Sequence, residues 1–123
     1  MFTDPKEIEV LDKTKEYILK GWIKRLSAKN KDGWAVHYTD SDAIEFCLGG
    51  AVYRAVSDLN LLPSDANSIT NRFSMMLKIN DPWKEKDYCN YTAFNDDPEV
   101  TKEQVLDFID KAKTLNENYL PGY

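Results

Sequence analysis

The fold is decided by residues 42–58, which read DAIEFCLGGAVYRAVSD. Apolar and small residues recur in this stretch at helical spacing and cover most of the helix circumference. A helix of this kind is buried among other elements, so the pattern predicts a central helix over residues 41–58. Its middle holds Gly49 and Gly50, each of which costs on the order of 1 kcal/mol of helix propensity. Such a pair predicts that another backbone or a ligand approaches the helix closely.

The sequence on either side of this stretch predicts three more helices and a hairpin. Asp4 and Pro5 are typical of a helix start, and apolar residues follow them at helical spacing. The turn pair Asp32-Gly33 lies between two extended stretches and predicts a β-hairpin. Thr101 with Gln104 forms a capping box before the last helix. We therefore expect helices at 5–20, 65–79 and 101–115, a hairpin at 22–39, a long loop at 80–100 and a tail at 116–123.

Length indicates a single domain, and the predicted helices place it in the mainly α class. The chain has 123 residues, 42% of them hydrophobic and 12% aromatic, which is enough for a core. We expect one compact four-helix domain over residues 1–123, with one short β-hairpin between its first two helices. No apolar run approaches the ~20 residues of a membrane span, and the start of the chain carries no signal-peptide pattern. Two cysteines fit a reducing compartment, so we expect a cytoplasmic protein that does not bind membranes.

Charge is distributed unevenly along a chain whose formal net charge is -5. Residues 20–34 hold five basic side chains against one acid, whereas residues 81–123 hold ten acids against five bases. Such asymmetry marks either a partner surface or simply a solvated face, and the solvated face is the commoner case.

Cys47 is the residue in the central helix with nucleophilic chemistry. A thiol hydrolase or transferase would pair it with His37 as the base and with Asn95 or Asp96 as the group that orients the base. A reactive thiol usually lies at a helix N-terminus, where the dipole lowers its pKa. The predicted helix places Cys47 about two turns inside, so we expect a small buried hydrophobic residue, with the enzyme as the alternative.

The predicted hairpin interleaves aromatic and basic residues. Trp22, Lys24, Arg25 and Trp34 form a combination that binds single-stranded nucleic acid or a nucleotide by stacking and phosphate contacts. In the alternative, the two tryptophans pack the hairpin onto the helices while the basic groups stay in water. The acidic balance of the whole chain favours the alternative.

Metal and cofactor motifs are missing from the sequence. One histidine and two distant cysteines do not supply the four ligands of a zinc site. The acidic run Asn95-Asp96-Asp97 lacks the alternating spacing of a calcium loop and fits a turn and helix cap better. We therefore expect neither a metal nor a cofactor.

The order of several short motifs resembles a family of small bacterial and phage proteins of unknown function. The motifs are Gly21-Trp22, then Phe46-Cys47 followed by Gly50-Ala51, then Phe94-Asn95-Asp96, and last Thr101 with Val105. The family typically has tryptophan where this chain has Phe46 and Phe94, and its central helix is poorer in glycine. The resemblance covers residues 11–113 and implies a cytoplasmic helical domain without a known activity. Its phage members imply a protein that binds components of a host.

The motifs also have a physical interpretation of their own. Cys47, Gly50 and Ala51 would form a groove of small residues on the central helix, against which Phe94 packs. Asn95 and its neighbour Asp96 would then bond free backbone amides at a helix end. In a functional version the groove is a pocket, and the same two polar side chains hold a small ligand.

Taken together, these features predict a non-catalytic binding or interaction protein. No catalytic constellation is stronger than its structural alternative, and this is the main ground for the prediction. We expect a protein partner, which would be a host protein if the chain is phage-encoded. The alternatives are the Cys47-dependent enzyme and nucleic-acid binding through the basic, aromatic hairpin.

Overall fold

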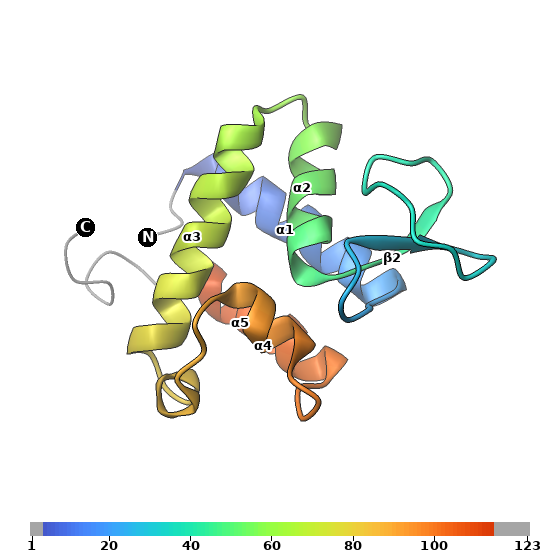
Figure 1. The fold of residues 1–123 in the computed structure, drawn as a ribbon. Helices are drawn as coiled ribbons and strands as arrows, with labels where there is room; N and C mark the ends of the chain where they lie inside the picture. Colours follow the sequence, from blue (N-terminus) through green and yellow to red (C-terminus); the bar gives the residue numbers. More distant parts are fainter. Residues whose placement is uncertain (1–3, 115–123) are drawn as a thin grey trace.

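Three long helices and a shorter central helix build the body of the protein (Figure 1). The computed structural model describes residues 4–114. The helix α2 packs against α1 and α3, and α1 also packs against α5. The short helix α4 contacts α2 and α3 from below in this view. The elements are α1 (Pro5–Lys20), β1 (Ala28–Asn30), β2 (Ala43–Phe46), α2 (Leu48–Asp58), α3 (Pro63–Ile79), η1 (Trp83–Lys86), α4 (Tyr91–Asp96) and α5 (Lys102–Thr114).

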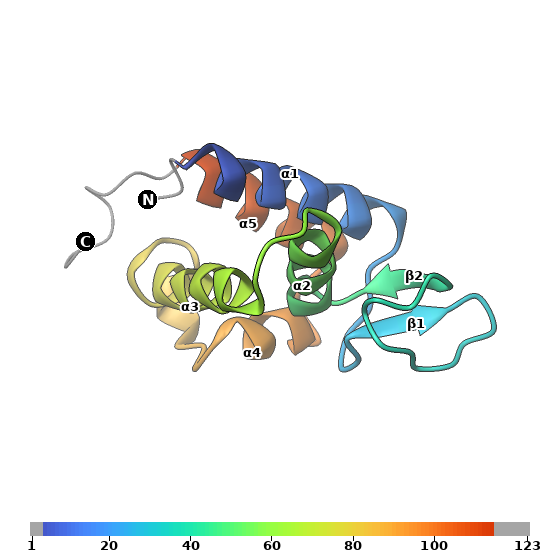
Figure 2. The same cartoon turned by 90° about the horizontal axis from the view of Figure 1, so that it is seen from above.

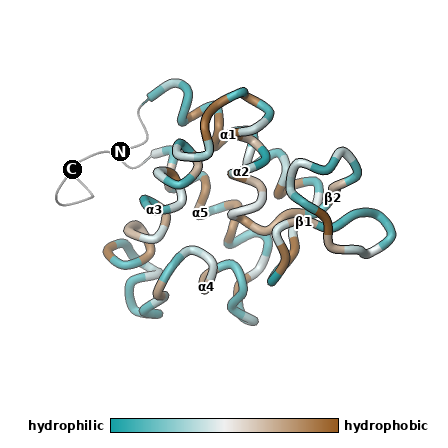
Figure 3. Tube along the Cα trace, turned by 45° about the horizontal axis from the view of Figure 1, so that its top comes forward, coloured by the Kyte–Doolittle hydropathy of each residue, from teal (hydrophilic) through white to brown (hydrophobic). Residues whose placement is uncertain are grey.

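The core lies between these helices, and the sheet projects from one end of them (Figure 2). Phe73, Phe94 and Phe108 are among its largest fully buried side chains, and neighbouring rings lie 5.1–5.2 Å apart. Hydrophobic and hydrophilic stretches alternate along the helices, whereas the loops beside the sheet are mostly hydrophilic (Figure 3). Among the helices of residues 4–114, none combines the length and apolar character that a membrane crossing needs. The predicted mainly helical class, with one short antiparallel strand pair between the first two helices, is confirmed.

The second strand of the sheet differs from the predicted one. The expected partner strand after the Asp32-Gly33 turn forms only one bridge, between Lys29 and Ala35. The antiparallel ladder instead joins β1 to β2, with Lys29 opposite Glu45 and Ala28 opposite Phe46. The pairing of β1 with β2 is favoured over the predicted one because it buries Ala28 and Phe46 against the helices, where each is at most 2% exposed.

The central helix is shorter than predicted, because α2 begins at Leu48 and the stretch before it is strand β2. Residues 43–46 satisfy a helical pattern and a strand pattern equally, and pairing with β1 decides between them. Gly49 and Gly50 therefore lie in the first turn of α2. The expected close approach of another backbone at this pair is confirmed, since a Cβ on Gly50 would stand 2.0 Å from the carbonyl oxygen of Ser27.

The predicted caps of α1 and α5 are confirmed, whereas the predicted start of α3 and the predicted 80–100 loop need correction. α1 has the predicted bounds, and Asp4 caps it by accepting a hydrogen bond from the amide of Lys6. α3 begins two residues early, because Pro63 suits its first position. The capping box before α5 is present, with Thr101 and Gln104 bonded to each other's amides. The predicted 80–100 loop contains η1 and α4, and the predicted tail at 116–123 lies outside the described residues.

Candidate functional site

Cys47 is the N-cap of α2, which corrects its predicted place inside the helix. Its sulfur accepts a hydrogen bond from the amide of Gly50 at 3.2 Å. Burial raises the pKa of the Cys47 thiol, and the charge of Asp96 raises it further, whereas the amides of Gly50 and Gly49 lower it. Burial is the largest of these effects, so the thiol stays protonated although the helix position would favour the thiolate.

Asn95 joins three segments of the chain and has no hydrogen-bonding capacity left for a ligand. Its Oδ1 accepts from the indole Nε1 of Trp22 at 2.7 Å and from the amide of Leu48 at 3.0 Å. Its Nδ2 donates to the carbonyl of Ile23 at 3.2 Å and to the carboxylate of Asp96 at 3.0 Å. An amide side chain has two donors and two acceptor sites, and here all four are engaged. The expected bond to a free amide at a helix end is therefore present, and it is structural.

Asp96 holds the neighbouring segment through its first carboxylate oxygen. Its Oδ1 accepts from the backbone amide of Arg25 at 2.8 Å as well as from Asn95. Arg25 has a positive φ of 72°, a conformation that costs a non-glycine residue energy and that this bond helps to hold. Within residues 4–114, no hydrogen bond or ion pair engages the second oxygen of Asp96.

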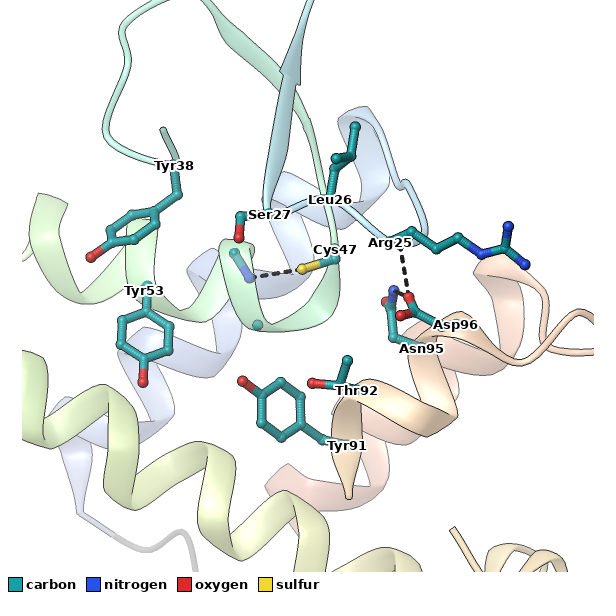
Figure 4. A pocket seen from close by; sticks show the side chains of 12 residues that line it. Arg25, Leu26, Ser27, Tyr38, Cys47, Tyr53, Tyr91, Thr92, Asn95 and Asp96 are labelled. Carbon is teal, nitrogen blue, oxygen red and sulfur yellow. Dashed lines mark hydrogen bonds between the residues drawn. The ribbon is translucent and has the colours of Figure 1, made fainter. Parts of the chain in front are cut away.

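A cavity of about 260 Å³ opens between the start of α2, residues 25–27 and α4 (Figure 4). Tyr38, Tyr53 and Tyr91 line it on one side of Cys47, and Asn95 and Asp96 line it on the other. We call this cavity the tyrosine pocket. The ring of Tyr91 packs closely on the glycines of α2 at this pocket. A Cβ on Gly49 would stand 2.8 Å from that ring, so a larger residue there would displace it.

The tyrosines of the pocket are held from different sides. The rings of Tyr38 and Tyr53 lie 5.5 Å apart between centroids, and the hydroxyl of Tyr53 bonds the side chain of Asn67. The amide of Tyr91 donates to the hydroxyl of Ser74 at 3.0 Å. Burial raises the pKa of the Tyr91 hydroxyl, so this hydroxyl remains a neutral donor at physiological pH.

The structure does not assemble the predicted thiol triad. His37 is exposed, bonds the hydroxyl of Thr39 through Nδ1 at 2.6 Å and is not among the residues that line the tyrosine pocket. Asn95 and Asp96 bond backbone groups and each other, with no bond to a histidine in the described residues. The other cysteine, Cys89, is exposed. Among residues 4–114, no group of three potential metal ligands lies close together.

The two tryptophans predicted to bind nucleic acid lie in different environments, one half-buried and one exposed. Trp22 is fixed by its bond to Asn95, and the ammonium of Lys24 covers its ring at 5.2 Å from the centroid. Only Trp34 of the two tryptophans stands free in water, with 71% of its surface exposed. Strand β2 also brings Glu45 opposite Lys29, which reduces the positive charge of this region. Packing of Trp22 therefore fits the alternative interpretation better than a stacking platform.

The sequence motifs predict Phe94 as the aromatic residue beside the small residues of the central helix, and they miss the tyrosines of the pocket. Phe94 is buried among the rings of Trp83, Tyr88 and Phe108, and the ring that faces Gly49 belongs to Tyr91. The one signal in the sequence was the glycine pair in α2, which pointed to a close neighbour without naming it.

The comparisons with known proteins agree with an uncharacterised family. The chain matches a family of unknown function, DUF6197, over residues 3–115. Comparison of the chain with curated proteins and with solved structures gave no match.

Proposed function

Since the chain belongs to DUF6197, a family of unknown function, we propose its function from the site itself: it is a non-catalytic binding protein. The tyrosine pocket is its binding site. The observation that carries the proposal is the neighbourhood of Cys47, whose sulfur serves as a helix cap with a raised pKa while His37 lies elsewhere. A protonated thiol is a weak nucleophile, whereas aromatic rings and hydroxyls around a cavity suit binding.

The size of the pocket limits what it can hold. Its volume of about 260 Å³ lies below the ~300–1,000 Å³ of sites for drug-sized ligands. The ligand is therefore one small group, either a small molecule or a side chain that a partner protein presents. The family resemblance of the sequence implies a host protein in the cytoplasm as the partner. Such a protein would present a side chain to the pocket.

Nuclear magnetic resonance of the ¹⁵N-labelled protein tests this proposal. We would titrate it with a panel of small cations, anions, neutral alcohols and free amino acids, and follow the amides of Gly49, Gly50 and Thr92. The proposal expects at least one compound to shift these amides in a saturable way. Thr92→Trp should abolish the shifts, because Thr92 is exposed and lines the pocket. Thr114→Trp, at an exposed position on α5, is the matched control. A panel without any saturable shift at these amides contradicts the proposal.

Alkylation separates a binding protein from a thiol enzyme. We expect iodoacetamide to modify the exposed Cys89 first and Cys47 much more slowly at neutral pH, since burial raises the pKa of Cys47. Mass spectrometry across pH reads both sites in one sample. Rapid labelling of Cys47 with a midpoint well below the ~8.5 of a free thiol would show an activated thiolate, and the non-catalytic proposal would then be wrong.

A further inference from the structure

Asp96 gives the tyrosine pocket a negative charge that the described part of the chain does not neutralise. Its Oδ1 accepts two hydrogen bonds from Arg25 and Asn95, and neither of these bonds is an ion pair, since they come from a backbone amide and a side-chain amide. The guanidinium of Arg25 extends away from the cavity (Figure 4). Asp96 is half-buried and lines the cavity, and a carboxylate in this position attracts a cation.

The aromatic wall of the pocket suits the same charge. Tyr38, Tyr53 and Tyr91 line one side of the cavity (Figure 4), and the faces of aromatic rings attract cations through their quadrupole. The protein itself uses this contact nearby, where the ammonium of Lys24 lies 5.2 Å from the centroid of the Trp22 ring. Aromatic side chains combined with a carboxylate are the usual composition of sites for ammonium groups.

The N-terminus of α2 beside the pocket does not offer a site for anions. A helix N-terminus binds anions through its free amides. At α2, the amide of Leu48 donates to Asn95, the amide of Gly50 donates to the Cys47 sulfur, and the amide of Ala51 donates to the Cys47 carbonyl. The amide of Gly49 also interacts with the Cys47 sulfur. With these donors engaged within the chain, the helix start does not offset the charge of Asp96.

We infer that the tyrosine pocket binds a cationic group, an alkylammonium or a guanidinium, which pairs with Asp96 on one side and contacts the tyrosine rings on the other. This inference rests on the proposed binding function and specifies its ligand class. The same chemistry can come from a free amine or from a lysine or arginine side chain of a partner protein. The volume of about 260 Å³ admits one such group and its first carbon atoms.

The test compares ligands of the same shape and different charge. Choline is the cation, and 3,3-dimethyl-1-butanol is its uncharged isostere. A second pair, n-butylammonium and butyrate, reverses the sign of the charge. Affinity is read from the amide shifts of Gly49, Gly50 and Thr92 at low and at high salt. We expect each cation to bind at least tenfold tighter than its uncharged or anionic counterpart, and we expect added salt to weaken it.

A pair of variants identifies the carboxylate as the source of this preference. Asp96→Asn retains an oxygen for the bonds to Arg25 and Asn95 and removes the charge, so choline affinity should fall about tenfold. Asp107→Asn makes the same chemical change at an exposed position on α5 that does not line the pocket, so choline affinity should not fall. The wild-type comparison of choline with its isostere gives the answer even if Asp96→Asn does not fold.

The outcomes distinguish this inference from the proposed function. If the isostere binds at the same amides as tightly as choline, the cationic class is wrong and the binding function stands. If no compound shifts these amides, both are wrong. A blocked lysine amide that binds more tightly than n-butylammonium supports the inference and indicates a partner protein as the source. Equal affinities support it with a free amine as the source.

Discussion

Asn95→Ala removes the side chain that joins α2, α4 and the segment after α1. The substitution leaves the amide of Leu48 and the indole Nε1 of Trp22 without an acceptor, and the carbonyl of Ile23 without a donor. Leu48 is completely buried, so water does not replace the lost bond there. A buried polar group without a partner costs about 1–3 kcal/mol. Counting the two donors, we expect the free energy of unfolding to fall by about 3 kcal/mol.

Urea unfolding followed by tryptophan fluorescence and circular dichroism measures this loss. With an m-value of about 2 kcal/mol/M, the midpoint should fall by about 1.5 M. The control is Asn90→Ala, which makes the same chemical change at the exposed N-cap of the same helix α4. Loss of that cap should cost about 1 kcal/mol. If Asn95→Ala destabilises no more than Asn90→Ala does, the reasoning on Asn95 is refuted.

Three further predictions concern packing, pH and surface charge. Gly50→Ala should lower the free energy of unfolding by about 2 kcal/mol, because its methyl would stand 2.0 Å from a backbone oxygen. Gly49→Ala should lower it less, because its methyl meets a tyrosine ring that can move. Urea midpoints of the two variants check this order, and equal losses would contradict it. Burial, together with the bond to Asp58, raises the pKa of Tyr17 to about 12. The native state therefore holds this proton more tightly than the unfolded chain, so its stabilisation is complete below about pH 10 and is lost as the pH rises toward about 12. Tyr17→Phe should flatten the loss of stability over that interval in urea melts, and an unchanged slope would contradict the assignment. Lys15→Ala breaks a partly exposed ion pair of 2.7 Å between α1 and α5 and should cost less than about 1 kcal/mol by the same assay.

Features that depend on neighbouring residues were predictable from the sequence. The cap at Asp4 and the capping box at Thr101 each use residues within three positions, and both are present in the structure. The bond from Asn95 to a free amide at a helix end was also predictable, because an amide side chain is a good acceptor and a helix start has unpaired donors.

Features that depend on distant segments were not predictable. Residues 43–46 become a strand because they pair with Ala28–Asn30, and the apolar pattern of the stretch does not distinguish this strand from a helix. This pairing moves Cys47 from a helix interior to a helix start, which changes the basis for judging its chemistry. The tyrosine pocket combines Tyr38, Tyr53 and Tyr91 from three separate segments, so no local motif marks it.

The bond between Asn95 and Leu48 also links the pocket to the cooperativity of folding. The two residues are 47 positions apart, so this bond forms only after α4 has docked on α2. A local opening that lifts α4 away would expose the amide of Leu48 to hydrogen exchange and would also remove Tyr91 and Asp96 from the pocket. Exchange at this single amide is therefore a direct measure of how often the pocket is intact. Any ligand that binds the intact pocket must slow this exchange in proportion to its occupancy.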